Sequence, residues 1–150
     1  MVTEIHVGAA SGRPFFLRPL IVGLDNPHSA DPRLALWPHP KGCAGARLAE
    51  LAGLSPRAYL RAFDRANACD LDRASFWPSQ GPGRTVILLG RAVAKWAGMP
   101  AAPFWRPLSH AGCAALVIPH SSGRCLIYND PEARGLARAI LRQAASAAVP

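Results

Sequence analysis

Several features that would assign a protein to a familiar class are missing from this sequence. Its four cysteines are far apart and form no C-x-x-C pair. That spacing excludes a zinc ribbon and a tightly spaced cluster site, so we expect neither a metal nor a cofactor. The cysteines are predicted to be buried free thiols. They are Cys43, Cys69, Cys113 and Cys125.

Long apolar runs are also absent. No run approaches the roughly 18 residues that cross a membrane. The N-terminus lacks the charged-then-apolar pattern of a signal peptide. We therefore expect a cytoplasmic protein that makes no contact with a membrane.

Acidic residues and lysine are scarce. Asp and Glu together number 9 against 17 Lys and Arg, which gives a net charge of +8. Lys41 and Lys95 are the only lysines, so nearly all of the positive charge is arginine. Guanidinium groups suit bidentate contacts with phosphate. The excess indicates a polyanionic partner, nucleic acid first, unless the source proteome is rich in Arg and Ala.

The hydrophobic pattern predicts a single α/β domain over residues 1–150. A chain of 150 residues suits one core, and half of its residues are hydrophobic. Apolar runs predict strands at 20–23, 62–68, 85–89 and 114–118. Helical spacing and caps predict helices at 44–52, 56–61, 91–97 and 131–145, the last one capped by Asp130. The intervening segments 25–45, 70–83 and 99–112 are interpreted as loops, and residues 1–19 as an arm.

Short apolar strands that alternate with helices predict a three-layer α/β/α architecture with a mostly parallel, four-stranded sheet. The turns after parallel strands converge on one edge, and ligands bind there. Polar residues follow each predicted strand. They are Asp25-Asn26-Pro27, Asn67, Gly90-Arg91 and His120-Ser121-Ser122.

Four segments in this order resemble the motifs of the uracil-DNA glycosylase superfamily. Its members carry Gly-x-Asp/Asn/Glu-Pro after the first strand and His-Pro-Ser or Asn-Pro-Ser, followed by Gly, near the C-terminus. The matching segments here are Val22-Gly23-Leu24-Asp25-Asn26-Pro27, Asn67-Ala68-Cys69, Val86-Ile87-Leu88-Leu89-Gly90-Arg91 and Pro119-His120-Ser121-Ser122-Gly123-Arg124. The resemblance implies a uracil-DNA glycosylase-like domain with its core at about residues 20–143. It is closest to the cluster-free, mismatch-specific uracil/thymine branches.

Two departures from the family pattern bear on the catalytic residues. The first motif has one residue more than usual. Aligned on Gly23, its catalytic position is Asp25; aligned on Pro27, the position is Asn26. The second motif has Ser121 where proline is usual.

The resemblance implies base flipping followed by hydrolysis of the base–sugar bond. His120 would donate an N–H to the pyrimidine oxygen as negative charge develops there. Asp25 would polarise the attacking water and stabilise the sugar cation, whereas Asn26 could only orient water. Asn67 would pair with the edge of uracil, since its amide is both donor and acceptor.

Other residues are expected to hold the base and the DNA. Trp37 is the leading candidate for an aromatic platform, with Phe104 and Trp105 behind it. Gly23 and Pro27 complete the base-binding motif. The resemblance implies that Ser121, Ser122 and Gly123 grip phosphates, that Arg124 fills the vacated stack, and that Arg91 also contacts DNA.

Plainer interpretations stay open for these residues. His120 could be an ordinary structural histidine, and residues 25–27 an ordinary Asx turn. Arg134, Arg138 and Arg142 share one helix face, either as a phosphate-binding stripe or as a solvated face. His28, His39 and Cys43 match no common zinc spacing. An acyl-transfer serine beside His120 would lack the Gly-x-Ser-x-Gly elbow.

The leading hypothesis is a monomeric, metal-free, monofunctional DNA glycosylase of base excision repair. It would remove uracil or a related pyrimidine and leave an abasic site. Lyase activity is not expected, because neither Lys41 nor Lys95 lies in a motif. The alternatives are a non-catalytic binder of DNA or modified nucleotides and an enzyme of phage DNA hypermodification. The 25–27 turn discriminates between catalysis and binding.

Overall fold

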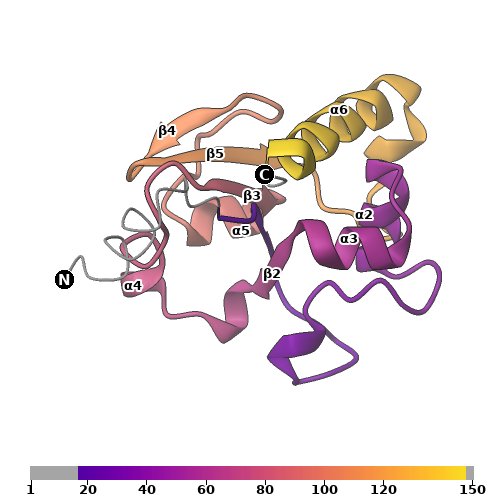
Figure 1. Ribbon diagram of the computed structural model, residues 1–150, viewed down its shortest axis with the longest axis horizontal. Helices are drawn as coiled ribbons and strands as arrows, with labels where there is room; N and C mark the ends of the chain where they lie inside the picture. Colours follow the sequence, from indigo (N-terminus) through magenta and orange to yellow (C-terminus); the bar gives the residue numbers. More distant parts are fainter. Residues whose placement is uncertain (1–16, 148–150) are drawn as a thin grey trace, which may run out of the picture.

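The computed structural model describes residues 17–147. Most of the predicted N-terminal arm, through residue 16, lies outside the described part. Figure 1 shows a twisted sheet with helices packed against it, and the last helix lies beside an earlier one. The α/β class predicted from the sequence is confirmed.

The sheet has five strands in the order β2-β1-β3-β5-β4. Four of them are parallel: β1 (Leu20–Gly23), β2 (Asp64–Asn67), β3 (Thr85–Leu89) and β5 (Cys113–Ile118). Three coincide with predicted strands to within a residue. The second was predicted as 62–68 but is shorter, because helix α3 extends to Ala62 and a 3-10 turn begins at Ala68.

The prediction of four strands was wrong, because β4 (Leu108–His110) adds an antiparallel edge strand. It was predicted as part of a loop. Ala111 and Gly112 connect it to β5, with φ of 52° and 80°. A two-residue hairpin with both central residues at positive φ matches the hand of the sheet twist. Because alanine occupies the first of these positions, the sequence lacks the Asn-Gly or Asp-Gly pair that usually indicates such a hairpin.

Helices cover both faces of the sheet. On one face lie α2 (Ala44–Ala52), α3 (Pro56–Ala62) and α6 (Pro131–Ala147); on the other lie α4 (Arg73–Phe76) and α5 (Arg91–Trp96). Helix α4 was predicted as loop, and it is a single turn capped by the Asp72 carboxylate. Asp130 accepts from the Glu132 N–H at 3.2 Å, which confirms the predicted cap of α6. Three 3-10 turns complete the chain: η1 (Pro32–Leu34), η2 (Ala68–Asp70) and η3 (Leu126–Asn129).

Alternate residues of each central strand pack into opposite halves of the core. Ile21 and Ile87 face α2, α3 and α6, whereas Val22 and Leu88 face α4 and α5. All four side chains are fully buried. Burial on both faces explains why these strands are continuous apolar runs. Within the described residues, no helix is both long enough and apolar enough to cross a membrane.

Candidate functional site

The four parallel strands end at one edge of the sheet, and each end carries a predicted site residue. Gly23 pairs with Asn67 at the ends of β1 and β2, and Leu89 pairs with Ile118 at the ends of β3 and β5. Because β3 lies between β1 and β5, the turns that follow those two strands begin about 10 Å apart.

The turn after β1, residues 24–28, is here called the Asp25 turn. Asn26 Nδ2 donates to the Leu34 carbonyl at 3.2 Å, and its Oδ1 accepts from the His28 N–H at 3.0 Å. The Asn26 side chain is therefore committed to the local backbone. Asp25 is exposed and makes no hydrogen bond to any other described residue. Of the two predicted catalytic positions, only Asp25 presents a side chain that is free to act; Pro27 is exposed beside it.

The carboxylate of Asp25 lies towards the β2 side of the edge. Desolvation and then the negative charges of Asp70 and Asp25 raise the pKa of the Cys69 thiol. The Cys69 N–H also donates to the Leu24 carbonyl at 3.2 Å. These contacts tie the Asp25 turn to the segment that follows Asn67.

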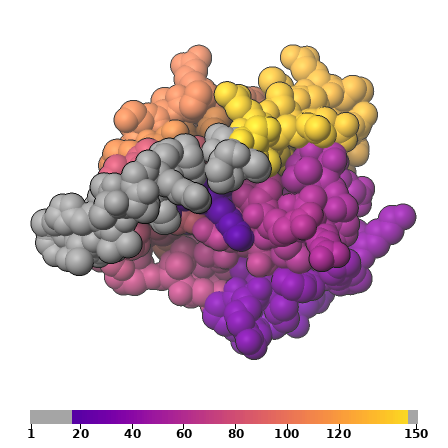
Figure 2. All heavy atoms as spheres, viewed as in Figure 1, coloured from indigo at the N-terminus to yellow at the C-terminus, as the bar shows by residue number. Residues whose placement is uncertain are grey.

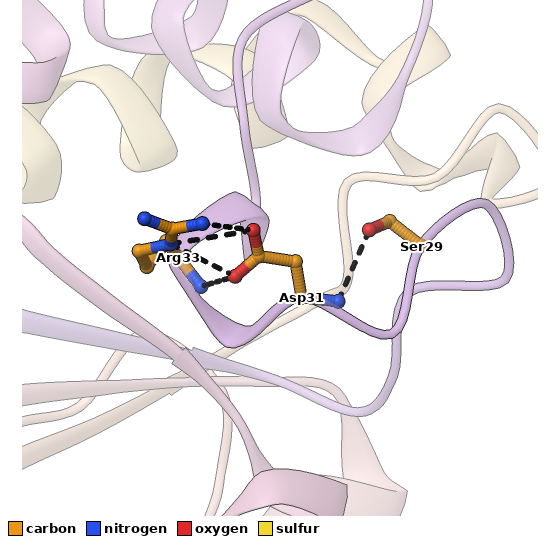
Figure 3. A network of polar contacts seen from close by, with 3 residues as sticks. All are labelled: Ser29, Asp31 and Arg33. Carbon is orange, nitrogen blue, oxygen red and sulfur yellow. Dashed lines mark hydrogen bonds and ion pairs between the residues drawn. The ribbon is translucent and has the colours of Figure 1, made fainter.

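A small polar network shapes the loop beyond the Asp25 turn (Figure 3). The Asp31 N–H donates to Ser29 Oγ at 3.1 Å, and the Asp31 carboxylate forms an ion pair with Arg33 at 2.9 Å. The hydrogen bonds from Arg33 lower the pKa of Asp31. These charges are satisfied within the loop, so they are separate from the chemistry of the strand ends.

The loop then returns to the sheet at Leu36. This residue is buried with a φ of 50°, a conformation that non-glycine residues rarely adopt. The Tyr59 hydroxyl donates to the Leu36 carbonyl at 2.9 Å. A Cβ on Gly45 would lie 2.2 Å from the same carbonyl oxygen, and a Cβ on Gly23 would lie 3.2 Å from Leu36 Cδ2. The two glycines therefore allow Leu36 to cover the end of β1.

Asn67 is the most unusual polar residue at this edge. It is only 1% exposed, and its Oδ1 is buried with no hydrogen-bond partner. A Cβ on Gly23 would lie 3.0 Å from that oxygen, so the glycine makes room for the amide. Leaving a buried acceptor unpaired costs about 1–3 kcal/mol. Such a group calls for an explanation, and a bound ligand would supply the missing donor.

The aromatic residues predicted to form a platform are partly engaged by other side chains. The Arg65 guanidinium lies 5.4 Å from the centroid of the half-buried Trp37 ring. The Arg91 guanidinium lies 4.0 Å from the Phe104 ring and also donates to the Ala102 carbonyl. Trp105 packs edge-on against Tyr128. Arg91, predicted to contact DNA, is thus held against the protein.

The turn after β5, residues 119–124, is here called the His120 turn. The exposed imidazole of His120 packs over the end of β3, where a Cβ on Gly90 would lie 3.6 Å from His120 Cδ2. Ser122 Oγ lies 2.9 Å from His120 Nδ1. If the serine donates this bond, the ring proton lies on Nε2, which can then donate a hydrogen bond to a ligand.

Two further hydrogen bonds fix the backbone of the His120 turn. Ser121 is 2% exposed, and its hydroxyl donates to the Ala44 carbonyl at 2.9 Å. The Tyr128 hydroxyl donates to the Pro119 carbonyl at 2.7 Å. Ser121 was predicted to contact DNA, yet its hydroxyl is directed into the protein. Gly123 and Arg124 are exposed, and Ser122 is half-buried, so these three remain available to a ligand.

Two features near the His120 turn were missed from the sequence. Leu126 is 71% exposed and Ile127 is 37% exposed, both on η3 immediately after the turn. The sequence signal was present in the apolar pair that follows Cys125. In addition, an open pocket of about 510 Å³ lies between α2 and α6. Neither Asp25 nor His120 lines it.

The residues considered for zinc do not form a site in the described part of the chain. There, no group of three or more His, Cys, Asp or Glu side chains could hold a metal ion. Cys43 instead caps α2: its sulfur donates to the Trp37 carbonyl at 3.2 Å and accepts from the Ala46 N–H at 3.4 Å.

Comparison with protein-family models, with curated proteins and with solved structures found no match to this chain. The side chains at the edge of the sheet are therefore the basis for a functional proposal.

Proposed function

We propose that this protein is a DNA glycosylase that hydrolyses the N-glycosidic bond of uracil or a related damaged or modified pyrimidine. The observation that best supports this activity is the buried amide of Asn67, with its unpaired Oδ1, at the same sheet edge as Asp25 and His120. A base-reading group, a carboxylate and an imidazole are the three functions that the reaction needs.

Asn67 would read the base. A side-chain amide offers a donor and an acceptor together, and this pair matches the edge of uracil in one orientation. Exclusion of water from the Asn67 amide would strengthen those bonds. Leu36 packs beside this position in a strained backbone conformation. A flipped base would therefore displace Leu36 from Gly23, and relief of the strain would offset part of the cost of opening.

His120 would stabilise the departing base. As the bond between base and sugar breaks, its electron pair goes to the pyrimidine ring, and negative charge develops on the ring oxygen. A donor already oriented towards that oxygen lowers the barrier. The contact between Ser122 Oγ and His120 Nδ1 would keep the proton on Nε2. A neutral imidazole suffices, because the charge develops only during the reaction.

Asp25 would act on water. The free carboxylate can orient a water molecule towards the sugar carbon, accept its proton as the new carbon–oxygen bond forms, and stabilise the positive charge on the sugar. The products are an abasic site and the free base. Lys41 and Lys95 belong to neither turn, so a Schiff-base lyase step is not part of the proposal.

The exposed apolar pair on η3 suits the insertion step. A base must leave the stack before it can reach the sheet edge, which costs a few kcal/mol. Apolar side chains that insert between base steps offset this cost in other DNA-binding proteins. Leu126 would act in this way beside the exposed Arg124, while Gly123 allows the DNA backbone to approach the His120 turn.

A non-catalytic binder on the same fold is the second candidate. This candidate is favoured because the Asn26 side chain is bonded to the local backbone and because the Asn67 side chain is almost fully buried. Such a protein would grip DNA or a modified nucleotide without hydrolysis. The exposed, unbonded Asp25 carboxylate is the feature that favours the enzyme instead.

The test is an excision assay on labelled oligonucleotides with alkaline cleavage of the abasic product. The substrates are single-stranded uracil, U·A, U·G and T·G, and the proteins are the wild type and the double variant Asp25→Asn/His120→Ala. Release of uracil by the wild type and its loss in the double variant would support the glycosylase. Retained, salt-sensitive DNA binding without excision of any base would exclude uracil and thymine excision and favour the binder.

A further inference from the structure

The pocket between α2 and α6 is strongly basic. Helices α2 and α6 lie side by side (Figures 1 and 2), and the pocket opens between them. Three arginines and a single carboxylate line it, which leaves an excess of two positive charges. The lining residues that matter here are Arg47, Glu50, Ser121, Arg134, Gly135 and Arg138.

The arginines of this pocket are held in place by backbone carbonyls rather than by acidic side chains. Arg138 donates from Nε to the Leu51 carbonyl at 3.1 Å, and Arg134 donates from Nη1 to the Tyr128 carbonyl at 2.8 Å. In residues 17–147 the ion pairs are Asp31–Arg33 and Asp64–Arg84, and neither is in the pocket. Within this range no acidic side chain pairs with the pocket arginines, so they retain spare N–H donors for an anion.

Gly135 lines the pocket without a side chain. It lies within α6, where glycine costs about 0.5–1 kcal/mol relative to alanine. A Cβ at this position would meet no atom within 4 Å, so no close packing demands the glycine. The absence of a side chain between Arg134 and Arg138 instead leaves space beside two guanidinium groups.

We propose that this pocket binds a phosphate group of a nucleic-acid strand. Arg47 connects it to the His120 turn, because a Cβ on Gly123 would lie 3.5 Å from Arg47 Nη2. A strand bound at that turn would thus continue along α2 into the pocket. This course of the strand rests on the proposed function; the phosphate site itself does not. Arg142, on the same helix, lies by Gly53 outside the pocket.

The test compares Gly135→Glu with its uncharged match Gly135→Gln. Both residues favour a helix more than glycine does, so both variants should fold. Binding to a uracil-free single-stranded oligonucleotide is measured by fluorescence anisotropy between about 50 and 200 mM salt. Gly135→Glu should weaken binding by about tenfold to a hundredfold, because a carboxylate would occupy the phosphate site. Gly135→Gln should weaken binding by less than about tenfold, since its side chain narrows the same space but adds no negative charge.

Two other variants control for general charge effects. Glu50→Gln should tighten binding by about threefold, because it removes the only carboxylate of the pocket. Arg142→Gln removes a charge from the same helix outside the pocket and should change binding by less than about threefold. The salt slope of Gly135→Glu should fall by about 0.7 for each phosphate contact that is lost.

Equal binding by Gly135→Glu and Gly135→Gln would overturn the phosphate site, whatever the excision assay shows. Weakened binding by Gly135→Glu, with no excision from any substrate, would support the site and contradict the glycosylase. Oligonucleotides with and without a 5′-phosphate distinguish the source of the phosphate. A preference for the 5′-phosphate that only Gly135→Glu abolishes would assign the pocket to a strand end, and no preference would assign it to an internal phosphodiester.

Discussion

The Asp25 turn and the His120 turn carry similar polar residues but are held in different ways. In each, one side chain is committed to the backbone while its neighbour is exposed. Asn26 reaches a carbonyl only eight residues away, whereas Ser121 reaches one 77 residues away on α2. The Asn26 side chain thus stabilises its own loop, whereas the Ser121 side chain joins its turn to a distant helix.

The two tyrosines of the chain make the same contrast. Tyr128 donates to the carbonyl of Pro119, immediately before His120. Tyr59 donates to the carbonyl of Leu36, well beyond Asp25. The Tyr128 hydroxyl therefore holds the backbone next to the imidazole, whereas the Tyr59 hydroxyl holds a residue well beyond Asp25, whose turn is instead joined to η2 by the Cys69 N–H. For a glycosylase, this contrast predicts that the Tyr128 hydrogen bond matters more for activity than the Tyr59 hydrogen bond.

The largest effect is expected in the Asp25 turn. Asp25→Asn should lower uracil excision by about a hundredfold to ten-thousandfold, since an amide cannot take the proton of water. Asn26→Ala should stay within about tenfold, because its side chain serves only the local backbone. Single-turnover rates on single-stranded uracil measure both variants. A larger loss in Asn26→Ala than in Asp25→Asn would reverse the assignment of the catalytic position.

In the His120 turn, His120→Ala should lower the excision rate by about a hundredfold to a thousandfold, the usual effect of losing one oriented donor. Ser122→Ala should cost about tenfold, because the hydroxyl selects the tautomer without touching the base. The rate as a function of pH separates the two roles. Ser122→Ala should shift the pH profile, whereas a purely structural serine would lower the rate equally at all pH values.

Loss of the Tyr59 hydroxyl and loss of the Tyr128 hydroxyl should affect stability alike but activity differently. Tyr128→Phe and Tyr59→Phe should each lower the free energy of unfolding by about 1–3 kcal/mol, since each leaves a buried carbonyl unpaired. Only Tyr128→Phe should also lower the excision rate at temperatures where both variants are folded. Urea unfolding and single-turnover rates measured on the same preparations test this. Equal losses of activity would mean that the Tyr128 hydrogen bond has no special role in positioning His120.

Alkaline pH should lower the free energy of unfolding through the same two tyrosines. Burial raises the pKa of both Tyr59 and Tyr128. Below about pH 9 both phenols are neutral in the folded and unfolded chains, and their contribution is intact. Above about pH 10 only the unfolded chain loses these protons, so the free energy of unfolding falls by up to about 1.4 kcal/mol per pH unit for each tyrosine.

Urea midpoints at a series of alkaline pH values check this dependence. The two tyrosines should contribute alike, because burial raises the pKa of each well above that of the unfolded chain. The slope should therefore decrease by a similar amount in Tyr59→Phe and in Tyr128→Phe. An unchanged slope in both phenylalanine variants would assign the alkaline loss to other groups.

The smallest effect on stability is expected at Asn67. Asn67→Ala removes a carbonyl oxygen that has no partner, so stability should stay within about 1 kcal/mol of the wild type. Excision and the preference for uracil over cytosine should nevertheless fall. Thermal unfolding together with the excision assay tests both expectations. A large loss of stability would mean that the amide is a structural residue.

Much of the fold could be predicted from local pattern. The runs at Leu20, Thr85 and Ala114 are continuously apolar, as expected for strands that helices cover on both faces. The cap at Asp130 marked the start of α6 correctly. In contrast, α4 and β4 were missed, because each is short and half-exposed and neither has a clear period.

The candidate site, like the fold, could be predicted only in part. Residue types and their order indicated that Asp25, Asn67 and His120 lie at strand ends, and parallel pairing then brought those strand ends to one edge. Sequence could not choose between Asp25 and Asn26, since both suit an Asx turn. Nor could it show that Ser121 reaches Ala44, because that bond joins residues 77 positions apart.

By itself, the sequence determined the class of the fold, the order of the parallel strands' polar ends and the excess of arginine, all of which depend on local composition and spacing. Tertiary structure alone decided which side chains stay free: Asp25 rather than Asn26, His120 rather than Ser121. It also decided that Arg47 of α2 meets Arg134 and Arg138 of α6 around one pocket. The physical reason is that hydrogen-bond partners and shared cavities arise from contacts between distant segments, which exist only once the chain has folded.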